Sequence, residues 1–372
     1  MQQTDNSSLN ILITGGAGFI GSNFIPYFLE KHPNYRVINL DLLTYAGSLE
    51  NLQEVKDHPR YEHIKGDICN RELVEYIFQK YDITGVIHFA AESHVDNSIE
   101  DPGVFVHTNV NGTFTLLDVA YRYWMEGPFK YRKRHRKKEE TLNYQTLTKA
   151  LPRFHHISTD EVYGTLSNDP NELFTEKTPY APNSPYSASK AASDMIVRSY
   201  RHTYGMNTII TNCSNNYGPK QHDEKLIPTI IRNAIKGNSI PIYGDGKNIR
   251  DWLYVLDHCK GIDFAFHKGE AGETYNIGGR NEKDNLYIAH TICEILDELY
   301  PIEENKFIKH QTSNIKHYKD LIVFVKDRPG HDRRYAIDAT KIENELGWMA
   351  DENFQSGIIK TIKWYLEKYS AK

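Results

Sequence analysis

A tyrosine and a lysine stand four residues apart in the segment Tyr186-Ser187-Ala188-Ser189-Lys190. On a helix, side chains at this spacing share one face and lie one turn apart. We expect the ammonium of Lys190 to lower the pKa of the Tyr186 phenol, because a nearby opposite charge favours the ionised form. A tyrosinate can remove the proton from an alcohol whose carbon gives up a hydride. A surface pair that arises by chance is the alternative interpretation.

Two carboxyl side chains follow a predicted strand at residues 154–158, in Thr159-Asp160-Glu161. The carboxyl ends of strands are where α/β sheets bind ligands. Adjacent carboxyls beside a hydride-transfer site suggest one additional acid and one additional base. Elimination of water from a sugar needs both, because oxidation at C4 acidifies the C5 proton and the C6 hydroxyl leaves as water. The alternative is that Asp160 caps a helix whose first turn contains Glu161.

A glycine-rich segment, residues 14–21, joins a predicted strand to a predicted helix. Gly15 permits a tight turn, Gly18 lets the backbone approach a pyrophosphate, and Gly21 allows close packing of helix and sheet. The amides that begin the helix then face the phosphates. Asp41 ends the next predicted strand, where a carboxylate can bond ribose hydroxyls and would repel a 2′-phosphate. This predicts a site for NAD rather than NADP. The positive nicotinamide ring of oxidised NAD would also lower the pKa of the Tyr186 phenol. A structural turn is the alternative for the glycines alone.

Two further segments fit the same site. Asp67, in Gly66-Asp67-Ile68, follows a short predicted strand and could meet the adenine edge. Phe89-Ala90-Ala91-Glu92-Ser93 ends the next predicted strand, and its small residues leave room for a cofactor. Each would be an ordinary strand end if it stood alone.

Short apolar runs alternate with amphipathic stretches in the first half of the chain, which predicts right-handed βαβ units and a parallel sheet. The expected fold class is therefore α/β, a Rossmann-type doubly wound parallel sheet with a smaller α/β C-terminal substrate lobe. We expect the first domain at residues 1–224 and the second, interwoven with it, at residues 225–372. Predicted strands are 10–14, 35–41, 61–65, 85–90, 154–158 and 208–212, predicted helices are 20–31 and 71–81, and residues 240–243 and 273–277 are predicted as short isolated strands of the smaller lobe.

Composition excludes several classes of function. The 372 residues are 39% hydrophobic and 25% charged, as in a folded protein, and the net charge of −5 argues against nucleic-acid binding. The four cysteines form no CxxC or zinc pattern, so no metal site is predicted and reduced thiols are expected. The polar start of the chain has no apolar signal core, and no uncharged run is long enough to span a bilayer. We therefore expect a cytoplasmic protein.

One segment looks inserted. Residues 130–138 contain seven lysines or arginines in nine positions, within an insertion at about 129–150. An anionic partner is one interpretation. A solvated surface loop with its own acidic neighbours, Glu139 and Glu140, is favoured, because most short charge runs bind nothing specifically.

Together these motifs resemble the extended short-chain dehydrogenases/reductases and, within them, the dTDP-glucose 4,6-dehydratase family. Thr159–Gly164 and Ser184–Lys190 carry the resemblance most strongly. It covers the chain from about Asn10 to Tyr369, with the basic insertion as the visible departure. The resemblance extends through Asn215–Pro219, Lys225–Pro228, Tyr243–Gly246, Arg250–Trp252 and Asp327–Tyr335.

The resemblance implies oxidation at C4, elimination of water across C5 and C6, and return of the hydride to C6, giving dTDP-4-dehydro-6-deoxy-glucose for deoxysugar (rhamnose-type) biosynthesis. It implies that Thr159 and Tyr186 contact the C4 oxygen, with Tyr186 as base. Lys190 then holds the nicotinamide ribose, Asp160 is the acid toward the C6 hydroxyl, and Glu161 is the base at C5.

The binding residues implied by the family pattern fall into two sets. The NAD set is Gly15, Gly18, Phe19, Ile20, Gly21, Asp41, Leu42, Leu43, Thr44, Asp67, Ile68, Phe89, Ala90, Ala91, Ser93, Thr108, Tyr186, Lys190 and Asn216. The nucleotide-sugar set is Ser93, Thr159, Asn215, Lys225, Leu226, Pro241, Ile242, Tyr243, Arg250, Asn285, Asp327, Arg328 and His331. Arg250 and Arg328 suit a diphosphate, although surface salt bridges are the alternative for each.

The family resemblance also implies a homodimer through a four-helix interface. Residues 109–122 and 187–204 are the candidate helices, with Tyr121, Tyr123, Met195 and Tyr200 as the apolar contacts or, equally, as core residues.

Two other functions compete with the dehydratase. A 4-epimerase or decarboxylase of the same branch needs no acid at C6, so the Asp160–Glu161 pair argues against it. A catalytically silent NAD-binding regulator would not be expected to keep both Tyr186 and Lys190. The choice between a thymine and a uracil nucleotide rests on the resemblance alone.

Overall fold

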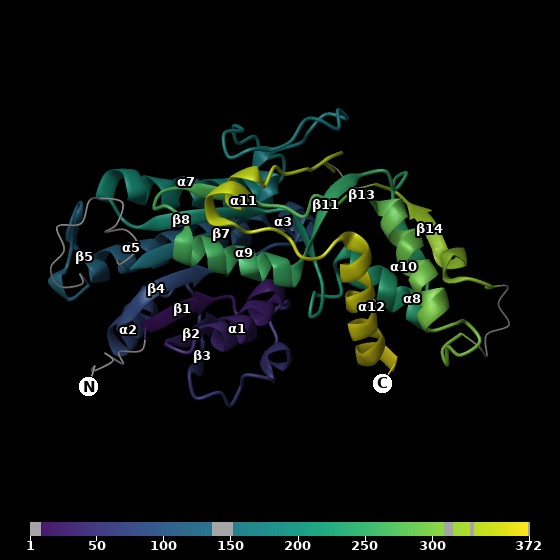
Figure 1. Ribbon diagram of the computed structural model, residues 1–372, viewed down its shortest axis with the longest axis horizontal. Helices are drawn as coiled ribbons and strands as arrows, with labels where there is room; N and C mark the ends of the chain where they lie inside the picture. Colours follow the sequence, from purple (N-terminus) through teal and green to yellow (C-terminus); the bar gives the residue numbers. More distant parts are fainter. Residues whose placement is uncertain (1–8, 136–151, 309–314, 328–330, 371–372) are drawn as a thin grey trace.

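The computed structural model describes residues 9–135, 152–308, 315–327 and 331–370. A seven-stranded sheet forms the centre of the larger part of the molecule, and every neighbouring pair of its strands is parallel (Figure 1). The chain adds β2 and β3 on one side of β1 and then crosses to the other side at β4, so the predicted doubly wound, Rossmann-type sheet is confirmed. In spatial order the strands are β12 (Thr274–Ile277), β8 (Thr208–Cys213), β7 (Arg153–Thr159), β4 (Ile83–His88), β1 (Leu9–Thr14), β2 (Tyr35–Asp41) and β3 (Tyr61–Lys65).

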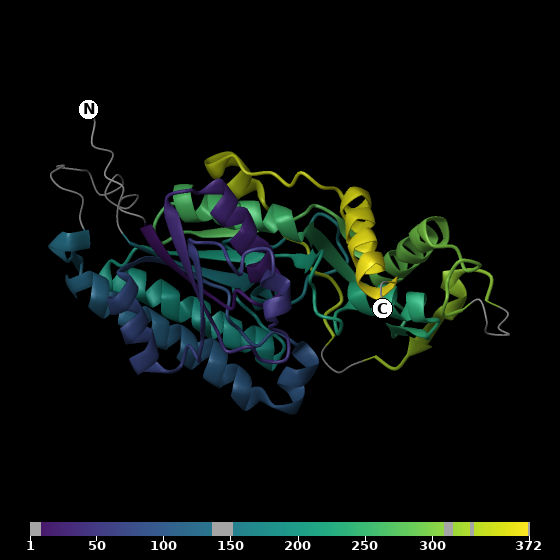
Figure 2. The same cartoon turned by 90° about the horizontal axis from the view of Figure 1, so that it is seen from below.

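Helices cover both faces of this sheet (Figures 1 and 2). Strand β1 shows how the two cores are divided, because successive side chains point to opposite faces. Ile11 and Ile13 pack in the core with one helical layer, whereas Leu12 packs in the core with the other. The first layer contains α1 (Phe19–Lys31), α9 (Val255–Lys268) and α11 (Thr340–Leu346), and the second contains α2 (Arg71–Tyr81), α5 (Thr113–Trp124) and α7 (Pro185–Tyr204).

Most predicted elements agree with the structure, and β2 and α2 have the predicted bounds. The strand predicted to reach residue 90 ends at His88, where the chain turns toward a cavity. The interpretation of residues 273–277 as an isolated strand of the smaller lobe is wrong. Strand β12 pairs with β8 and forms an edge of the large sheet, because its partner lies some sixty residues earlier in the chain. The division of the chain at residues 224 and 225 stays a prediction.

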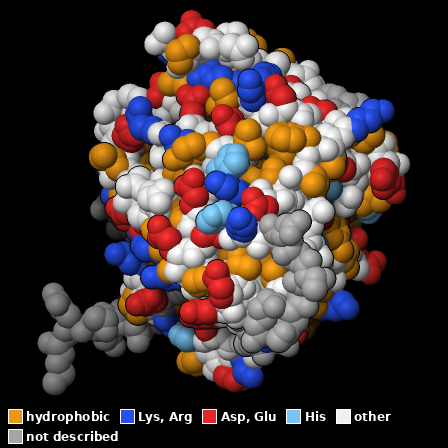
Figure 3. All heavy atoms as spheres, turned by 90° about the vertical axis from the view of Figure 1, so that its right-hand side faces the viewer, with side chains coloured by type: hydrophobic (Ala, Val, Ile, Leu, Met, Phe, Trp, Pro, Cys, Tyr) orange, Lys and Arg blue, Asp and Glu red, His pale blue; other side chains and the backbone are white. Residues whose placement is uncertain are grey.

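The smaller lobe lies at one end of the molecule and has a hydrophobic core of its own (Figure 1). Ile227, Ile230 and Ile231 recur at the spacing of one helix face and pack into this core. At its outer end, acidic and basic side chains are interspersed among hydrophobic ones (Figure 3). The lobe contains α8 (Leu226–Lys236), α10 (Asn285–Leu299), α12 (Phe354–Ser370), the parallel pair β10 (Ile240–Tyr243) and β14 (Ile322–Val325), and a sheet of β13 (Glu282–Asp284), β11 (Ile249–Tyr254) and β9 (Asn215–Tyr217).

The described part of the basic segment is a small hairpin followed by a helical turn. Lys130, Arg132, Lys133 and Arg134 are exposed, as expected of a surface segment, while Tyr131 is buried and its hydroxyl accepts a hydrogen bond from the Asn207 amide at 2.7 Å. Residues 136–150 of the insertion lie outside the described residues. The hairpin consists of β5 (Met125–Gly127) and β6 (Lys130–Tyr131), and the turn is η3 (Lys133–His135).

Six short helices complete the described chain. Among the residues that the structure describes, every helix is too short or too polar to traverse a membrane. The short helices are η1 (Leu49–Leu52), α3 (Val95–Glu100), α4 (Pro102–Phe105), the π-helix η2 (Val106–Gly112), η5 (Asp160–Tyr163) and η6 (Tyr318–Leu321).

Candidate active site

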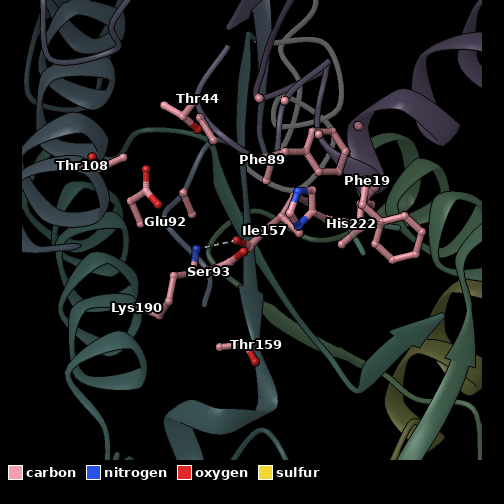
Figure 4. A pocket seen from close by; sticks show the side chains of 18 of the residues that line it. Phe19, Thr44, Phe89, Glu92, Ser93, Thr108, Ile157, Thr159, Lys190 and His222 are labelled. Atoms are coloured by element: carbon pink, nitrogen blue, oxygen red, sulfur yellow. Dashed lines mark hydrogen bonds between the residues drawn. The ribbon is translucent and has the colours of Figure 1, made fainter. Parts of the chain in front are cut away.

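A cavity runs along the carboxyl ends of the central strands, where β1, β2, β4, β7 and β8 end (Figure 4). Every residue of the predicted NAD set except Leu43 lines it. Thr159, Asp160 and Glu161 line the same cavity, as do Ser93, Asn215 and Lys225 of the predicted sugar-nucleotide set. The structure therefore brings the hydride-transfer pair and the two adjacent carboxyls to one place.

The glycine-rich turn forms one end of the cavity. Gly15 has a φ of +72°, and a Cβ there would lie 2.6 Å from the backbone of Ala90. A Cβ on Gly21 would lie 2.6 Å from the carbonyl oxygen of Gly15, so both positions require glycine. Helix α1 begins after Gly18 without a side-chain cap or an acidic residue in its first turn. Its first amides thus form an anion site of the kind that holds a pyrophosphate.

Asp41 lies at the end of β2, as predicted, and it also stabilises the glycine-rich turn. One carboxylate oxygen accepts a hydrogen bond from the Ala17 amide, and the other accepts one from the Leu43 amide, both at 2.8 Å. Each carboxylate oxygen can accept a further hydrogen bond. The position therefore still fits the predicted contact with ribose hydroxyls.

The loop after β4 is held in place by a buried asparagine of the π-helix. The Asn109 side chain accepts a hydrogen bond from the Glu92 amide at 2.8 Å and donates to the Glu92 carbonyl at 3.0 Å. It also donates to the Ser189 hydroxyl at 2.8 Å. Asn109 thereby fixes the 89–93 wall of the cavity relative to α7, and its neighbour Thr108 lines the same cavity near Glu92 (Figure 4).

Helix α7 carries Tyr186 and Lys190 into the cavity. Ser184 caps the helix in a capping box with Ser187, and Pro185 occupies the first helical position, so the first turn that contains Tyr186 is well fixed. Lys190 is buried, and its Nζ donates to the Ile157 carbonyl of β7 at 2.8 Å (Figure 4).

The sequence predicted that Lys190 lowers the pKa of Tyr186, and this prediction is wrong: the net effect of the protein groups around Tyr186 is to raise it. Burial raises the pKa of Tyr186 well above its usual value, and the negative charge of Glu161 and the nearby Cys213 raise it further, while a hydrogen bond with Thr159 opposes the shift. The reason is that desolvation dominates at a side chain only 8% exposed, while the Lys190 ammonium is directed to the β7 backbone.

Asp160 is a buried carboxyl at the end of β7. It is 2% exposed, and its Oδ2 makes no hydrogen bond within the described structure. Burial raises its pKa well above the usual range, the charges of Glu161 and Asp251 raise it further, and Arg250 and a hydrogen bond with Thr159 act in the opposite direction. Burial thus favours the protonated form of Asp160, which is the form that the predicted general acid needs.

The alternative interpretation of Asp160 as a helix cap is not supported. Thr159 is the residue that caps the short helix η5, and its hydroxyl accepts a hydrogen bond from the Glu161 amide at 3.3 Å. Asp160 and Glu161 lie in the first turn of η5 and line the cavity. Their carboxyl groups are therefore placed for chemistry rather than used to begin the helix.

The smaller lobe approaches these carboxyls through Arg250 and Tyr335. The Arg250 guanidinium donates to the Ile249 carbonyl at 2.7 Å and to the Asp332 carbonyl at 2.8 Å, and it lies 4.2 Å from the Tyr335 ring centroid. The negative charge of Glu161 helps to raise the pKa of Tyr335, after burial as the main cause. The β11 side of the lobe thus faces the reaction centre.

The other predicted substrate residues that the structure describes lie on the smaller lobe and do not line the cavity. Tyr243, Asp327 and His331 are grouped: the Tyr243 and His331 rings are 6.4 Å apart, and His331 Nδ1 lies 2.7 Å from Asp327 Oδ1. The Ile242 side chain is buried in the core of the lobe, so only its backbone remains for binding. Leu226 and Asn285 begin α8 and α10, Pro241 lies in β10, and Arg328 lies outside the described residues.

A cluster at the rim of the cavity was missed from the sequence. Glu92 and Glu224 both line the cavity, and burial, followed by the charge of Glu224, raises the pKa of Glu92. The Tyr45 hydroxyl donates to Glu224 at 3.3 Å, and Lys225 Nζ donates to the Ser93 carbonyl at 3.0 Å. Glu92 lies in the 89–93 segment, which the sequence had indicated as part of the cofactor site. Nothing in the sequence indicated that Glu224, more than a hundred positions away, would lie near enough to affect its pKa.

Comparisons with known proteins agree with this site. A family model for GDP-mannose 4,6 dehydratase matches residues 12–361. A dTDP-glucose 4,6-dehydratase from Haemophilus influenzae is 51% identical over 364 residues, which cover 98% of this chain and 99% of the relative. One from Neisseria gonorrhoeae is 50% identical over 363 residues, which cover 98% and 97%. The chain belongs to the dTDP-glucose 4,6-dehydratase family.

Solved structures of the family share this architecture. The dTDP-glucose 4,6-dehydratase of Bacillus anthracis in complex with NAD is 43% identical, with a TM-score of 0.79 and coverage of 97% of this chain and 98% of that one. That of Streptomyces venezuelae, also with NAD bound, is 40% identical, with a TM-score of 0.81 and 98% of both chains covered. A UDP-glucose 4-epimerase from Thermotoga maritima is 25% identical, with a TM-score of 0.75 and coverage of 97% and 99%. Because an epimerase has the same fold, the site rather than the fold must separate the two reactions.

Proposed function

We propose that this protein is a dTDP-glucose 4,6-dehydratase that uses NAD and forms dTDP-4-dehydro-6-deoxy-glucose. The observation that carries the proposal is the buried Asp160, whose pKa is raised, beside Glu161 in the cavity that also contains Tyr186 and Lys190. Family membership at about half identity over nearly the whole chain supports the same activity.

The residues of the cavity fit NAD. The uncapped start of α1 and the two glycines that admit no side chain suit its pyrophosphate, and Asp41 suits the ribose of its adenosine. When bound, NAD would supply the hydride acceptor for the first step, and its reduced form would supply that hydride for the last step.

The first step belongs to Tyr186 and Thr159. Tyr186 takes the proton of the C4 hydroxyl as the C4 carbon is oxidised, and Thr159 hydrogen-bonds the same oxygen. Since burial raises the pKa of Tyr186, the positive charges of Lys190 and of the cofactor ring are needed to favour its ionised form.

The second step belongs to the two carboxyls. The C4 ketone acidifies the C5 proton, which Glu161 removes, and Asp160 gives its proton to the C6 hydroxyl so that water leaves. The raised pKa of Asp160 favours the protonated form that this step uses. Hydride return to C6 and protonation at C5 then complete the product.

The nucleotide sugar would extend from the cavity toward the smaller lobe. Lys225 at the rim and Arg250 beside the carboxyls offer positive charge for a diphosphate. The relatives named above, which are dTDP-glucose enzymes, support thymine as the base.

The test is an assay of the purified protein with dTDP-glucose, UDP-glucose and GDP-mannose. We expect a 4-keto-6-deoxy product, detected by its absorbance in alkali, with dTDP-glucose as the best substrate. Substrate labelled with deuterium at C4 should give product labelled at C6, because the hydride returns within the same molecule. Epimerised sugar with the label still at C4 would contradict the proposal and favour a 4-epimerase.

We also propose that the protein works as a homodimer in the cytoplasm. All four cysteines are free thiols, which suits a reducing compartment. Of the four apolar contacts expected on α5 and α7, Tyr200 is buried in the core, whereas Met195 is 48% exposed. Phe114 of α5, 44% exposed, adds to an apolar surface on these helices. Light scattering after size exclusion should give twice the monomer mass, and a monomer mass would reject the proposal.

A further inference from the structure

A buried carboxyl and a buried imidazole lie behind Lys190, on the side away from the substrate cavity. His156 Nε2 is 3.4 Å from Lys190 Nζ and 3.2 Å from Asp194 Oδ1, so this ring nitrogen lies close to both the ammonium and the carboxylate. His156 and Asp194 are 1% and 0% exposed. None of the catalytic steps above uses either residue.

Two hydrogen bonds and the charge of Lys190 favour the ionised form of Asp194, although burial opposes them. Its Oδ2 accepts hydrogen bonds from the Ser158 hydroxyl and from the Tyr180 hydroxyl, both at 2.9 Å. Burial raises the pKa of Asp194 to about 6, against the opposing effects of Lys190, Ser158 and Tyr180. At neutral pH the buried group is therefore a carboxylate, and a buried charge of this kind needs a counter-charge.

Lys190 is the matching cation. Burial lowers the pKa of Lys190 to about 8, and the negative charge of Asp194 is the largest effect that opposes this shift. Removing Asp194 would leave only the desolvation, and Lys190 would lose its proton at a lower pH.

The other titratable groups that face this pair are neutral at the same pH. Burial lowers the pKa of His156, on β7, and of His88, on β4, well below the usual range. Burial raises the pKa of the Cys213 thiol, on β8, to about 12, and raises the pKa values of Tyr180 and Tyr186 above that of a free phenol. Lys190 and Asp194 are therefore the two charged groups of this buried cluster, and their opposite charges favour each other's ionised form.

We propose that Asp194 is a positioning residue for the reaction, the buried counter-ion whose negative charge keeps Lys190 protonated at working pH. A neutral Lys190 would neither donate all its hydrogen bonds nor favour the tyrosinate of Tyr186. The inference rests on the proposed function, in which Lys190 supports the hydride-transfer step.

The experiment compares the wild-type protein with Asp194→Asn and with the control Asp257→Asn. Asp257 is also a buried carboxyl, 1% exposed, but it lies on α9, where it accepts a hydrogen bond from the Glu352 amide, and it does not line the cavity. We expect the alkaline limb of the kcat profile of Asp194→Asn to move to lower pH by about one unit, and that of Asp257→Asn to stay in place. Asp194→Glu should recover part of the shift. A profile that coincides with wild type, with only the melting temperature reduced, would overturn the proposal.

A second readout needs neither substrate nor cofactor. Between pH values of about 6 and about 8, the pKa values of the pair, the folded variant would release the Lys190 proton earlier than the wild type. Since stability rises with pH where the unfolded state binds more protons, the melting temperature of Asp194→Asn relative to wild type should rise across this window. A constant difference would contradict the proposal, whatever the protein's substrate proves to be.

If Asp194→Asn fails to fold, Tyr180→Phe provides the test. This variant removes one of the two hydrogen bonds to Asp194 Oδ2 and leaves the carboxyl in place. The pKa of Asp194 should rise, so Asp194 should take up its proton at a higher pH, and the melting temperature of Tyr180→Phe relative to wild type should fall as pH rises through about 6. A relative melting temperature that does not change with pH would overturn the proposal.

Discussion

Two buried aspartates at opposite ends of the large sheet have pKa values that are shifted in opposite directions, upward for Asp160 and downward for Asp263. Asp160, at the carboxyl end of β7, has an oxygen without a hydrogen bond and a raised pKa. Asp263, on α9 near the amino end of β2, is 4% exposed and accepts hydrogen bonds from His32 at 2.8 Å and Tyr27 at 2.9 Å, while His267 Nδ1 lies 2.7 Å away. Burial alone would raise the pKa of Asp263, but the two histidines hold it well below its usual range. Burial therefore does not decide the charge of a carboxyl; the donors around it do.

The largest expected effect is on catalysis at Asp160. Asp160→Asn keeps the shape of the side chain but cannot donate a proton, so turnover should fall by about 10²- to 10⁴-fold. Oxidation at C4 should be partly retained, and reduced cofactor should accumulate as measured by its near-ultraviolet absorbance. Asp263→Asn should keep wild-type turnover. Equal losses of turnover in the two variants would contradict the assignment of a catalytic role to Asp160 alone.

The next largest effect is on stability at Asp263. Asp263→Asn removes charge-assisted hydrogen bonds and should lower the free energy of unfolding by about 1.5–3 kcal/mol at neutral pH, as measured by urea titration. The control Glu273→Gln removes an exposed carboxylate paired with Lys341 at 2.7 Å and should cost less than about 1 kcal/mol. If both variants lose the same amount, the buried cluster has no special role in stability.

Asp160→Asn should instead stabilise the protein, by about 0.5–2 kcal/mol, because catalytic groups are often held at a cost in stability. The wild-type carboxyl must keep its proton on folding although it ionises freely in the unfolded chain. Chemical denaturation of the two proteins at neutral pH measures the difference. A less stable variant would show that the buried acid contributes hydrogen bonds not seen in the structure.

The smallest effect concerns pH: in acid, the free energies of unfolding of Asp160→Asn and Asp263→Asn should approach that of the wild type. The depressed pKa of Asp263 gives stability that is present above its unfolded value and is lost as pH falls through the folded value. The raised pKa of Asp160 costs stability at neutral pH but not below its unfolded value. The stability difference at Asp160 should therefore shrink toward zero as pH falls from about 7 to about 4, whereas the difference at Asp263 should shrink, from the opposite side, only below about pH 4. Differences that stay constant with pH would mean that neither carboxyl is linked to folding through its ionisation.

Local signals were sufficient for the elements that position the cofactor site. The bounds of α2 were predictable because Asn70 caps its start with a hydrogen bond to the Leu73 amide and Asp82 ends it in a left-handed conformation. The glycine-rich turn and the strand ends at Asp41 and Thr159 depend on neighbours in the chain. Such features can be read from a window of a few residues.

What could not be predicted depends on contacts between distant parts of the chain. The pairing of β12 with β8 and the approach of Glu224 to Glu92 have no local pattern. The same holds for the pKa of Tyr186, because its spacing from Lys190 indicates nearness but not the direction of the ammonium or the depth of burial.

The late entry of β12 into the sheet bears on how the protein is made. Strand β8 remains the open edge of the growing sheet until residue 277 has been synthesised, and the first helical layer also lacks Ile342 and Trp348, buried core residues from much later in the chain. Unpaired strand edges and uncovered apolar surface make partly synthesised chains prone to aggregation. We therefore expect fragments that stop near residue 224 to be captured by chaperones on the ribosome, and the large domain to fold only when almost the whole polypeptide has emerged.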